Sequence, residues 1–150
     1  MSEPLCLRDI MTHPVVIVHL DDTLERVRAI FEASKFHHLV VVDGHRVVGV
    51  LSDRDLLKHV SPFIGRTFME RGQDLNTLRR RVHQVMSRDP VVARDDMPLL
   101  EAGRFLLEHA VTCLPVVDEA DRLCGVVTWR DLLPRCFACT PPAAGEAEAA

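Results

Sequence analysis

Short stretches of this sequence occur twice, in the same order and with an offset of 75 or 76 residues. In the longest pair, residues 49–57 and residues 125–133 carry Gly, Val, Arg, Asp and Leu-Leu at matching places. A fixed period of this kind indicates a duplicated supersecondary unit. The fold therefore depends on one unit and on how its two copies pack. The other matching pairs are Met11-Thr12 with Met86-Ser87, Pro14-Val15-Val16 with Pro90-Val91-Val92, and residues 39–43 with residues 114–118.

The length of the chain limits how the copies are stabilised. The 150 residues suffice for one ordinary domain or two very small ones. A unit of about 55 residues buries too little apolar surface to be stable alone. We therefore expect the copies to pack on each other as one pseudo-symmetric domain. The predicted boundaries are 5–60 for the first repeat, 61–81 for a linker with a helix, 82–136 for the second repeat and 137–150 for a disordered tail.

Composition and charge exclude several classes of protein. Apolar residues make up 47% and charged residues 27%, as in a globular protein with a real core. The net charge of −4 gives no positive field to attract nucleic acid or anionic lipid. Apolar runs such as residues 39–42 are far shorter than the ~18 residues of a membrane span, and the N-terminus does not resemble a signal peptide. We expect a cytoplasmic protein with no membrane partner, and nucleic acid is disfavoured as a partner.

The cysteines do not suggest a disulfide framework. There are five, an odd number, which fits reduced thiols in a cytosol. Only Cys136 and Cys139 have the spacing of metal ligands, and a single pair does not complete a tetrahedral zinc site. We predict no metal centre and leave the role of this pair open.

Hydrophobic periodicity predicts the same elements in both repeats. In the first, a strand at residues 15–18 precedes a helix at residues 23–34, whose apolar residues recur at helical spacing. Strands at 39–42 and 46–51 flank a short hairpin turn, and a helix opens at Ser52. The second repeat places its elements at 91–92, 99–109, 114–117, 123–127 and from Arg130 onward. Each repeat is thus predicted as β-α-β-β-α, an α/β (α+β) fold with pseudo-twofold symmetry.

The linker carries the only basic cluster. Residues 61–65 break regular structure, and residues 74–85 are predicted to be helical, with Arg79, Arg80 and Arg81 exposed. Because no aromatic residue or second basic cluster accompanies them, a solvated helix face is favoured over a nucleic-acid patch.

The repeated residues resemble the marks of the cystathionine-β-synthase (CBS) domain family. Those marks are Met-Thr/Ser, Pro-Val, Leu-Pro-Val-Val-Asp and Gly-h-h-Thr/Ser-x-x-Asp, where h is apolar, and the chain shows this set twice. The resemblance covers nearly all of residues 5–136 and implies a tandem CBS pair, also called a Bateman module. It further implies a protein that is not an enzyme. Such a pair binds adenosine-containing ligands in clefts between the repeats and relays their presence to an effector.

The Gly-h-h-Ser/Thr-x-x-Asp segment suits a ribonucleotide. Glycine permits close backbone approach, the hydroxyl lies near a helix N-terminus where phosphate is favoured, and the carboxylate accepts hydrogen bonds from both ribose hydroxyls. The same spacing is also a helix capping signature, which can coexist with ligand binding. By the resemblance, Asp55 and Asp131 are ribose anchors, and the neighbouring polar contacts are Ser52, Arg54, Thr128 and Arg130.

His37 and His38 occupy positions where nucleotide-binding members of the family carry a basic pair that meets phosphate. A histidine is largely neutral at pH 7 unless a phosphate raises its pKa, so the contribution of this pair should grow on acidification. A partly exposed pair at a strand edge is the alternative. The second repeat has Thr112 and Cys113 at these positions, which removes the positive donors there.

Other candidate residues are given structural roles. Asp53 lies in the first turn of a helix, where a carboxylate is favourable. Trp129, the only tryptophan, is assigned to packing in preference to base stacking. No nucleophile–base pair or phosphate-binding loop of the Gly-x-x-x-x-Gly-Lys type is present, so catalysis has no candidate residues.

Two hypotheses for function follow. The first is a regulatory module that binds AMP, ADP, ATP or a related adenosyl ligand, needs no other cofactor and signals to an unknown effector protein. The alternative is a ligand-independent module for dimerisation or protein interaction. A symmetric homodimer is expected in either case, because helix faces remain to be covered. Those faces are Leu24, Val27 and Phe31 in one repeat and Leu99, Ala102 and Leu106 in the other.

Overall fold

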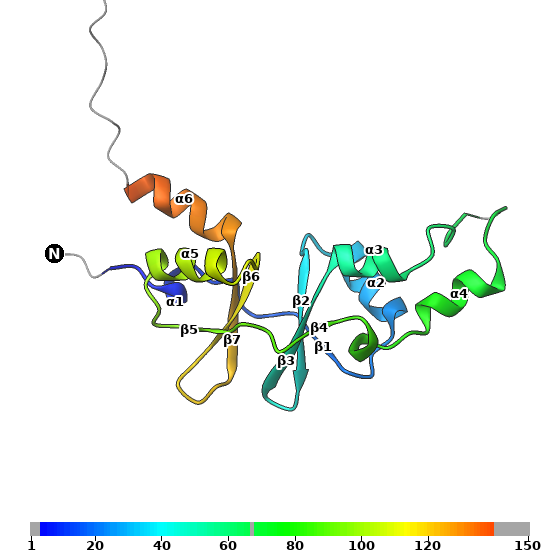
Figure 1. The fold of residues 1–150 in the computed structure, drawn as a ribbon, viewed down its shortest axis with the longest axis horizontal. Coiled ribbons are helices and arrows are strands. Elements are labelled where there is room, and N and C mark those ends of the chain that lie inside the picture. The colour runs from blue at the N-terminus through cyan, green and yellow to red at the C-terminus, as the bar shows by residue number, and fades with distance from the viewer. Residues whose placement is uncertain (1–3, 67, 140–150) are drawn as a thin grey trace, which may run out of the picture.

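The computed structural model describes residues 4–66 and 68–139, and Figure 1 shows them as two lobes lying side by side. Each lobe has the order β-α-β-β-α, which confirms the predicted mixed fold with tandem repeats. The first lobe holds β1 (Ile17–His19), α2 (Leu24–Ala33), β2 (His38–Asp43), β3 (Arg46–Ser52) and α3 (Asp53–His59). The second holds β5 (Ala93–Arg94), α5 (Leu99–Glu108), β6 (Cys113–Val117), β7 (Leu123–Thr128) and α6 (Trp129–Cys139). The remaining elements are α1 (Leu7–Ile10), α4 (Gly72–Leu78), the 3-10 helix η1 (Val82–Gln84) and β4 (Ser87–Arg88).

A small mixed sheet forms the base of each lobe. The first sheet has the order β1-β2-β3-β4, with β1 parallel to β2 and β3 antiparallel to both its neighbours. The second has the order β5-β6-β7, with β5 parallel to β6 and β7 antiparallel to β6. A parallel pair requires a crossover, which α2 or α5 supplies, whereas a hairpin joins the antiparallel pair. The last hairpin strand of each lobe, β3 or β7, then runs directly into a helix.

The apolar faces of α2 and α5 form the cores of their own lobes. Leu24 and Val27 of α2 are fully buried, and Ala102 and Leu106 of α5 are at most 6% exposed. The expectation that these faces contact a second chain is wrong, because the sheet beneath each helix already covers them. The apolar residues left exposed on these helices lie elsewhere, for example Leu107.

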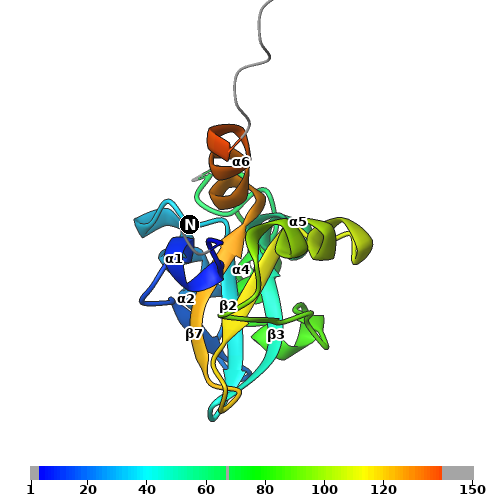
Figure 2. The ribbon, with the colours of Figure 1, turned by 90° about the vertical axis from the view of Figure 1, so that its left-hand side faces the viewer.

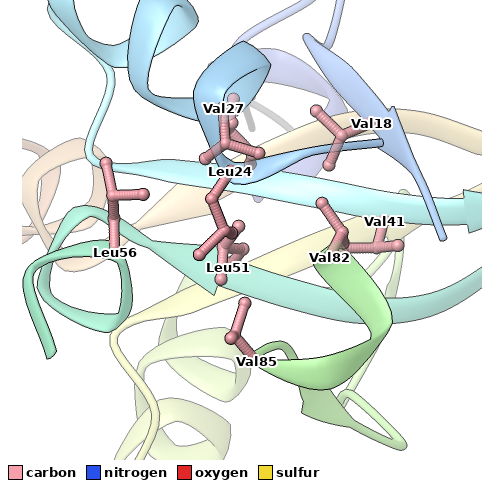
Figure 3. Packing of buried hydrophobic residues seen from close by; sticks show 9 residues of the cluster. Val18, Leu24, Val27, Val41, Leu51, Leu56, Val82 and Val85 are labelled. Atoms are coloured by element: carbon pink, nitrogen blue, oxygen red, sulfur yellow. The ribbon is translucent and has the colours of Figure 1, made fainter. Parts of the chain in front are cut away.

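The segment before each repeat packs on the opposite lobe. Leu7 of α1 is buried in the core of the second lobe, together with Leu114 and Val127. Conversely, Val82 and Val85 are buried in the core of the first lobe, where Figure 3 shows them beside Val41 and Leu51. In Figures 1 and 2 the N-terminal helix α1 accordingly lies with α5 and β7 and not with the first repeat. The sequence repeat and the packed lobe are therefore different units.

Backbone hydrogen bonds show the same exchange, in which the segment that precedes each repeat packs on the other lobe. The Thr12 amide donates to the Val126 carbonyl at 2.9 Å, and the Val126 amide returns a bond of 3.1 Å to the Thr12 carbonyl. By symmetry, Ser87 of β4 pairs with Val50 of β3 in the first lobe. Each Met-Thr/Ser motif thus adds backbone bonds to the edge of the other lobe's sheet, and the two lobes are interlocked.

Two glycines make room for the exchanged segments. A Cβ atom added to Gly125 would lie 2.3 Å from the sulfur of Met11, and one added to Gly49 would lie 2.6 Å from the sulfur of Met86. Neither distance is possible for real atoms. The expectation that these glycines admit a ligand is corrected, because methionine side chains from the exchanged segments occupy the space.

The linker helix is shorter than predicted. Helix α4 ends at Leu78, and the chain is irregular up to η1 instead of helical through residue 85. Arg81 Nη1 donates to the Asp21 carbonyl at 2.6 Å, and Arg80 Nη1 donates to His59 Nδ1 at 3.0 Å. These bonds hold the basic run against the first lobe, so it is not a continuous helix face.

At the C-terminal end, α6 continues to Cys139, past the predicted end of the second repeat at residue 136. The part of the tail from residue 140 lies outside the described residues. No helix in the described part of the chain is both long and apolar enough to cross a membrane.

Candidate functional site

Residues of both lobes line a cleft of about 550 Å³. Its polar wall consists of the turn from β3 to α3 and the equivalent turn from β7 to α6. Pro14, Val15 and Val16, which precede β1, form an apolar wall. Of the predicted site residues, Asp55 alone does not line this cleft. Those that do are His37, His38, Ser52, Arg54, Thr128, Arg130 and Asp131.

The two aspartates make the same local bonds. Asp131 Oδ2 accepts from the Thr128 amide at 2.7 Å and from its hydroxyl at 3.1 Å. Asp55 Oδ2 accepts from the Ser52 amide at 2.9 Å and from its hydroxyl at 2.8 Å, and it completes the predicted capping box of α3. Within the described residues, Oδ1 of Asp131 has no protein donor. Since Asp131 also lines the cleft, this oxygen can accept hydrogen bonds from a ligand.

His37 is held by an acidic neighbour. Its Nδ1 atom donates to Asp53 Oδ2 at 2.8 Å, and both side chains are partly exposed in the cleft. Burial alone would raise the pKa of Asp53, but the hydrogen bond and positive charge from His37 outweigh it and lower the pKa. Asp53, assigned only to the helix dipole, therefore also belongs to the site, as the hydrogen-bond partner of His37.

His38 connects the two lobes. Its Nε2 atom lies 3.2 Å from the hydroxyl of Thr112 in the second lobe. Burial lowers the pKa of His38, and the positive charges of His37 and Arg130 lower it further, against the opposing effect of Asp53 and Asp55. At neutral pH the ring is therefore uncharged in the absence of a ligand.

The equivalent of His38 in the second lobe is inert. Cys113 is buried, and burial raises the pKa of its thiol to about 12. The second repeat thus places no ionisable cation at this position, as its sequence predicts.

Two arginines complete the polar wall. Arg54 comes from the first lobe and Arg130 from the second, and both are exposed in the cleft. Neither forms an ion pair with a carboxylate in the described residues. The guanidinium of Arg130 lies over the ring of Trp129, 5.3 Å from its centroid, which is cation–π geometry. The cleft thus presents two unpaired guanidinium groups, which suit an anionic ligand.

A second groove of about 640 Å³ lies at the opposite ends of the strands. It is bordered by Gly44 and His45 of one hairpin and by Arg122 and Leu123 of the other. It contains none of the predicted site residues. No cluster of His, Cys, Asp and Glu in the described chain has the form of a metal site.

Comparison with known proteins identifies the family. The family model for the CBS domain matches residues 7–62 and again residues 82–136. The chain belongs to the CBS domain family. A CBS domain-containing protein of Dictyostelium discoideum is 33% identical over 129 residues, which cover 85% of this chain and 88% of the relative.

Solved CBS structures share the arrangement of the lobes. The Arabidopsis thaliana CBS-pair protein CBSX2, solved in complex with AMP, is 28% identical with a TM-score of 0.70, covering 89% of this chain and 96% of that one. The cytosolic domain of the Mg²⁺ channel MgtE, solved in complex with ATP, is 32% identical with a TM-score of 0.65. That match covers 84% of this chain and 46% of the MgtE chain. The predicted tandem CBS pair is confirmed.

Proposed function

We propose that this CBS pair is a regulatory module that binds an adenine nucleotide, AMP, ADP or ATP, or another adenosyl compound, in the cleft between its lobes. Binding changes the packing of the lobes, and an effector protein senses the change. The module performs no chemistry on its ligand and is not an enzyme. We expect it in the cytoplasm.

The observation that carries this proposal is the Asp131 carboxylate on the cleft wall. Thr128 holds one oxygen through two hydrogen bonds and thereby fixes the orientation of the carboxylate. The other oxygen is left to accept from a ribose, whose paired hydroxyls suit a carboxylate. Apolar Val15 and Val16 on the opposite wall provide a surface for a base.

The cationic side chains that line the same cleft support an anionic group on the ligand. Arg54 and Arg130 supply guanidinium groups that bind phosphate through paired hydrogen bonds. His37 and His38 add charge when protonated. The complexes of CBSX2 with AMP and of the MgtE domain with ATP support the adenine nucleotide class.

Thermal shift and calorimetry test the proposal. Purified protein is titrated with AMP, ADP, ATP, adenosine and S-adenosylmethionine, with GTP as the control for base preference. A ligand of the folded state adds about 2.7 kcal/mol of stability at 100 times its Kd. We expect an adenine nucleotide to raise the melting temperature and GTP to do so less. No shift with any adenosyl compound would contradict the proposal.

A ligand-independent interaction module is the second candidate. Exposed apolar side chains on α5 and α6 favour it, because Leu107 is 82% exposed and Phe137 is 74% exposed. We propose that these residues contact a second copy of the chain in a homodimer. Dimerisation is compatible with nucleotide binding, and only the absence of any ligand would leave it as the sole function.

A further inference from the structure

Exposed apolar side chains gather in the linker between the two repeats. Phe68 is fully exposed, Met69 is more than half exposed, and Phe63 and Leu75 are exposed in part. Figure 1 shows α4 and the loop before it at the outer end of the first lobe, away from the second lobe. The two matches of the CBS family model end at residue 62 and begin again at residue 82. These side chains therefore lie outside both repeats, and apolar groups exposed together are typical of an interaction site.

Hydrogen bonds within the linker hold this part of the chain in a closed loop. The Ser61 amide donates to the Thr77 hydroxyl at 3.1 Å, and the Ser61 hydroxyl donates to Asp74 Oδ1 at 2.6 Å. These two bonds tie the start of the loop to α4. Inside the loop, the Gly65 amide donates to Glu70 Oε2 at 2.7 Å. The exposed apolar side chains are therefore presented from a folded loop and not from an extended strand of chain.

The charge of the linker is opposite in sign to that of the rest of the chain. Residues 61–81 contain five arginines and two acidic residues, Glu70 and Asp74, which gives a net charge of +3. Because the whole chain is at −4, the remaining residues carry −7. Arg66 and Arg79 are exposed, and neither forms an ion pair with a carboxylate in the part of the chain that the structure describes. The linker thus offers positive charge beside its apolar groups.

This distribution of charge suits an anionic partner of limited size. A membrane surface or a nucleic-acid duplex carries negative charge over a wide area and would also meet the rest of the chain, which it repels. A short acidic segment of a protein needs to contact the linker alone, and its own apolar side chains can cover those of the linker.

We propose that the linker binds an effector protein through a segment in which Asp and Glu accompany large apolar residues. The surface that binds it, called here the linker surface, consists of Phe63, Arg66, Phe68, Met69, Leu75 and Arg79. This inference goes beyond the proposed function, because it does not require a bound nucleotide.

Peptide selection tests the inference without an assumed effector. A phage-displayed library of random peptides is selected on the intact protein, and the enriched sequences are synthesised for fluorescence polarisation. We expect enrichment of peptides that contain both acidic and large apolar residues. Phe68→Gln, and separately Arg66→Gln with Arg79→Gln, should each weaken their binding at least ~10-fold. No enrichment, enriched peptides without acidic residues, or equal binding to the variants would overturn the inference.

Matched changes on the second lobe are the controls. Leu100→Gln removes an exposed apolar side chain from α5, and Arg104→Gln with Arg135→Gln removes two exposed charges from α5 and α6. These variants should bind the peptides within about twofold of the unmodified protein, and all the variants should keep its melting temperature because the changed side chains are exposed. Equal weakening by the control changes would show that the peptides do not recognise the linker surface.

Two further measurements separate the other possible occupants of the linker surface. Phosphatidylserine vesicles should not bind the protein in sedimentation, and binding that Phe68→Gln abolishes would assign the surface to a membrane. Light scattering should give the same mass for Phe68→Gln as for the unmodified protein, and a lower mass would assign the surface to a second copy of the chain. Either result would overturn the inference and leave the proposed function standing, since ATP binding is measured separately.

Discussion

His38 lies in the cleft at a place where a positive charge is unfavourable without a ligand. Its pKa is lowered from 6.5, by burial first. Because the unfolded chain then binds a proton more readily than the folded chain, the stability due to neutral His38 is complete above pH 6.5 and is lost as pH falls through the lower folded value. We predict that His38→Gln reduces the loss of stability between about pH 7.5 and pH 5, measured by urea unfolding. An identical loss in both proteins would show that His38 does not titrate in this way.

A phosphate group bound in the cleft should favour the protonated form of the histidine pair over the uncharged form. We predict that replacing His37 and His38 by Ala weakens ATP and AMP binding far more than adenosine binding, and more at pH 6 than at pH 8. Loss of His37 also leaves the Asp53 carboxylate without its partner, and this negative charge then repels phosphate. Calorimetry at the two pH values measures the effect, and His19→Ala is the control because this exposed residue lies outside the cleft. Equal weakening of all three ligands would instead indicate damage to the fold.

At the scale of single residues, the sequence predicts site residues that belong to a motif. It misses site residues that are defined by contacts with residues far away in the sequence. Asp131 follows from the repeated motif and the histidine pair from the family resemblance, and all of them line the cleft. Asp53 was overlooked because its partner, His37, is 16 positions away. Thr112 meets His38 across 74 positions. The motif also treats Asp55 and Asp131 as equals, since identical spacing carries no information on which of them faces a cavity.

At the scale of the elements, the exchanged segments can pack closely only because Gly49 and Gly125 have no side chain. We predict that Gly125→Ala destabilises the protein by about 1–3 kcal/mol, because the new Cβ overlaps Met11 and displaces the segment after α1. Gly103→Ala is the control, as no atom lies within 4 Å of its Cβ position in α5 and the change should stabilise by about 0.5–1 kcal/mol. Urea unfolding measures both. Equal effects of the two substitutions would mean that Met11 moves aside without cost.

The elements themselves were largely predictable, and their partners were not. Helix α2 begins and ends where Thr23 and Ser34 predicted, because capping and periodicity are local properties of the chain. The apolar character of Leu7 and Val82 is equally visible in the sequence. Which lobe buries each of them depends on packing between the repeats. The duplicated pattern fits a segment that packs on its own repeat as well as one that packs on the other repeat.

For the whole molecule, the interlocked lobes should unfold together. We predict a single transition in differential scanning calorimetry, with equal calorimetric and van't Hoff enthalpies. Leu7→Ala empties a fully buried site in the second lobe and should lower the temperature of the whole transition, at a cost of about 2–5 kcal/mol. Leu5→Ala, at a position 43% exposed, should change it little. Two separate transitions would show that the lobes are independent.

The proposed homodimer is tested on the exposed faces of α5 and α6. We predict that the unmodified chain is dimeric by light scattering at micromolar concentration and that Leu107→Glu with Phe137→Glu makes it monomeric. Because both side chains are largely exposed within the chain, the far-ultraviolet circular dichroism should not change. Arg104→Glu introduces charge elsewhere on α5 and is the control. A monomeric unmodified protein would contradict the proposal.

The exchange of segments also constrains how this chain acquires its structure during synthesis. Domains on the ribosome generally fold from the N-terminus as they emerge. Here α1 has no surface to pack on until β6 and β7 of the second lobe have been made, and the first lobe lacks Val82 and Val85 until the linker is complete. Helix α1 must therefore remain without its packing partners while the segment up to β7 is translated. The nascent polypeptide cannot complete the core of the first lobe before Val82 and Val85 of the second repeat have been made, and α1 finds its partners only once β7 follows.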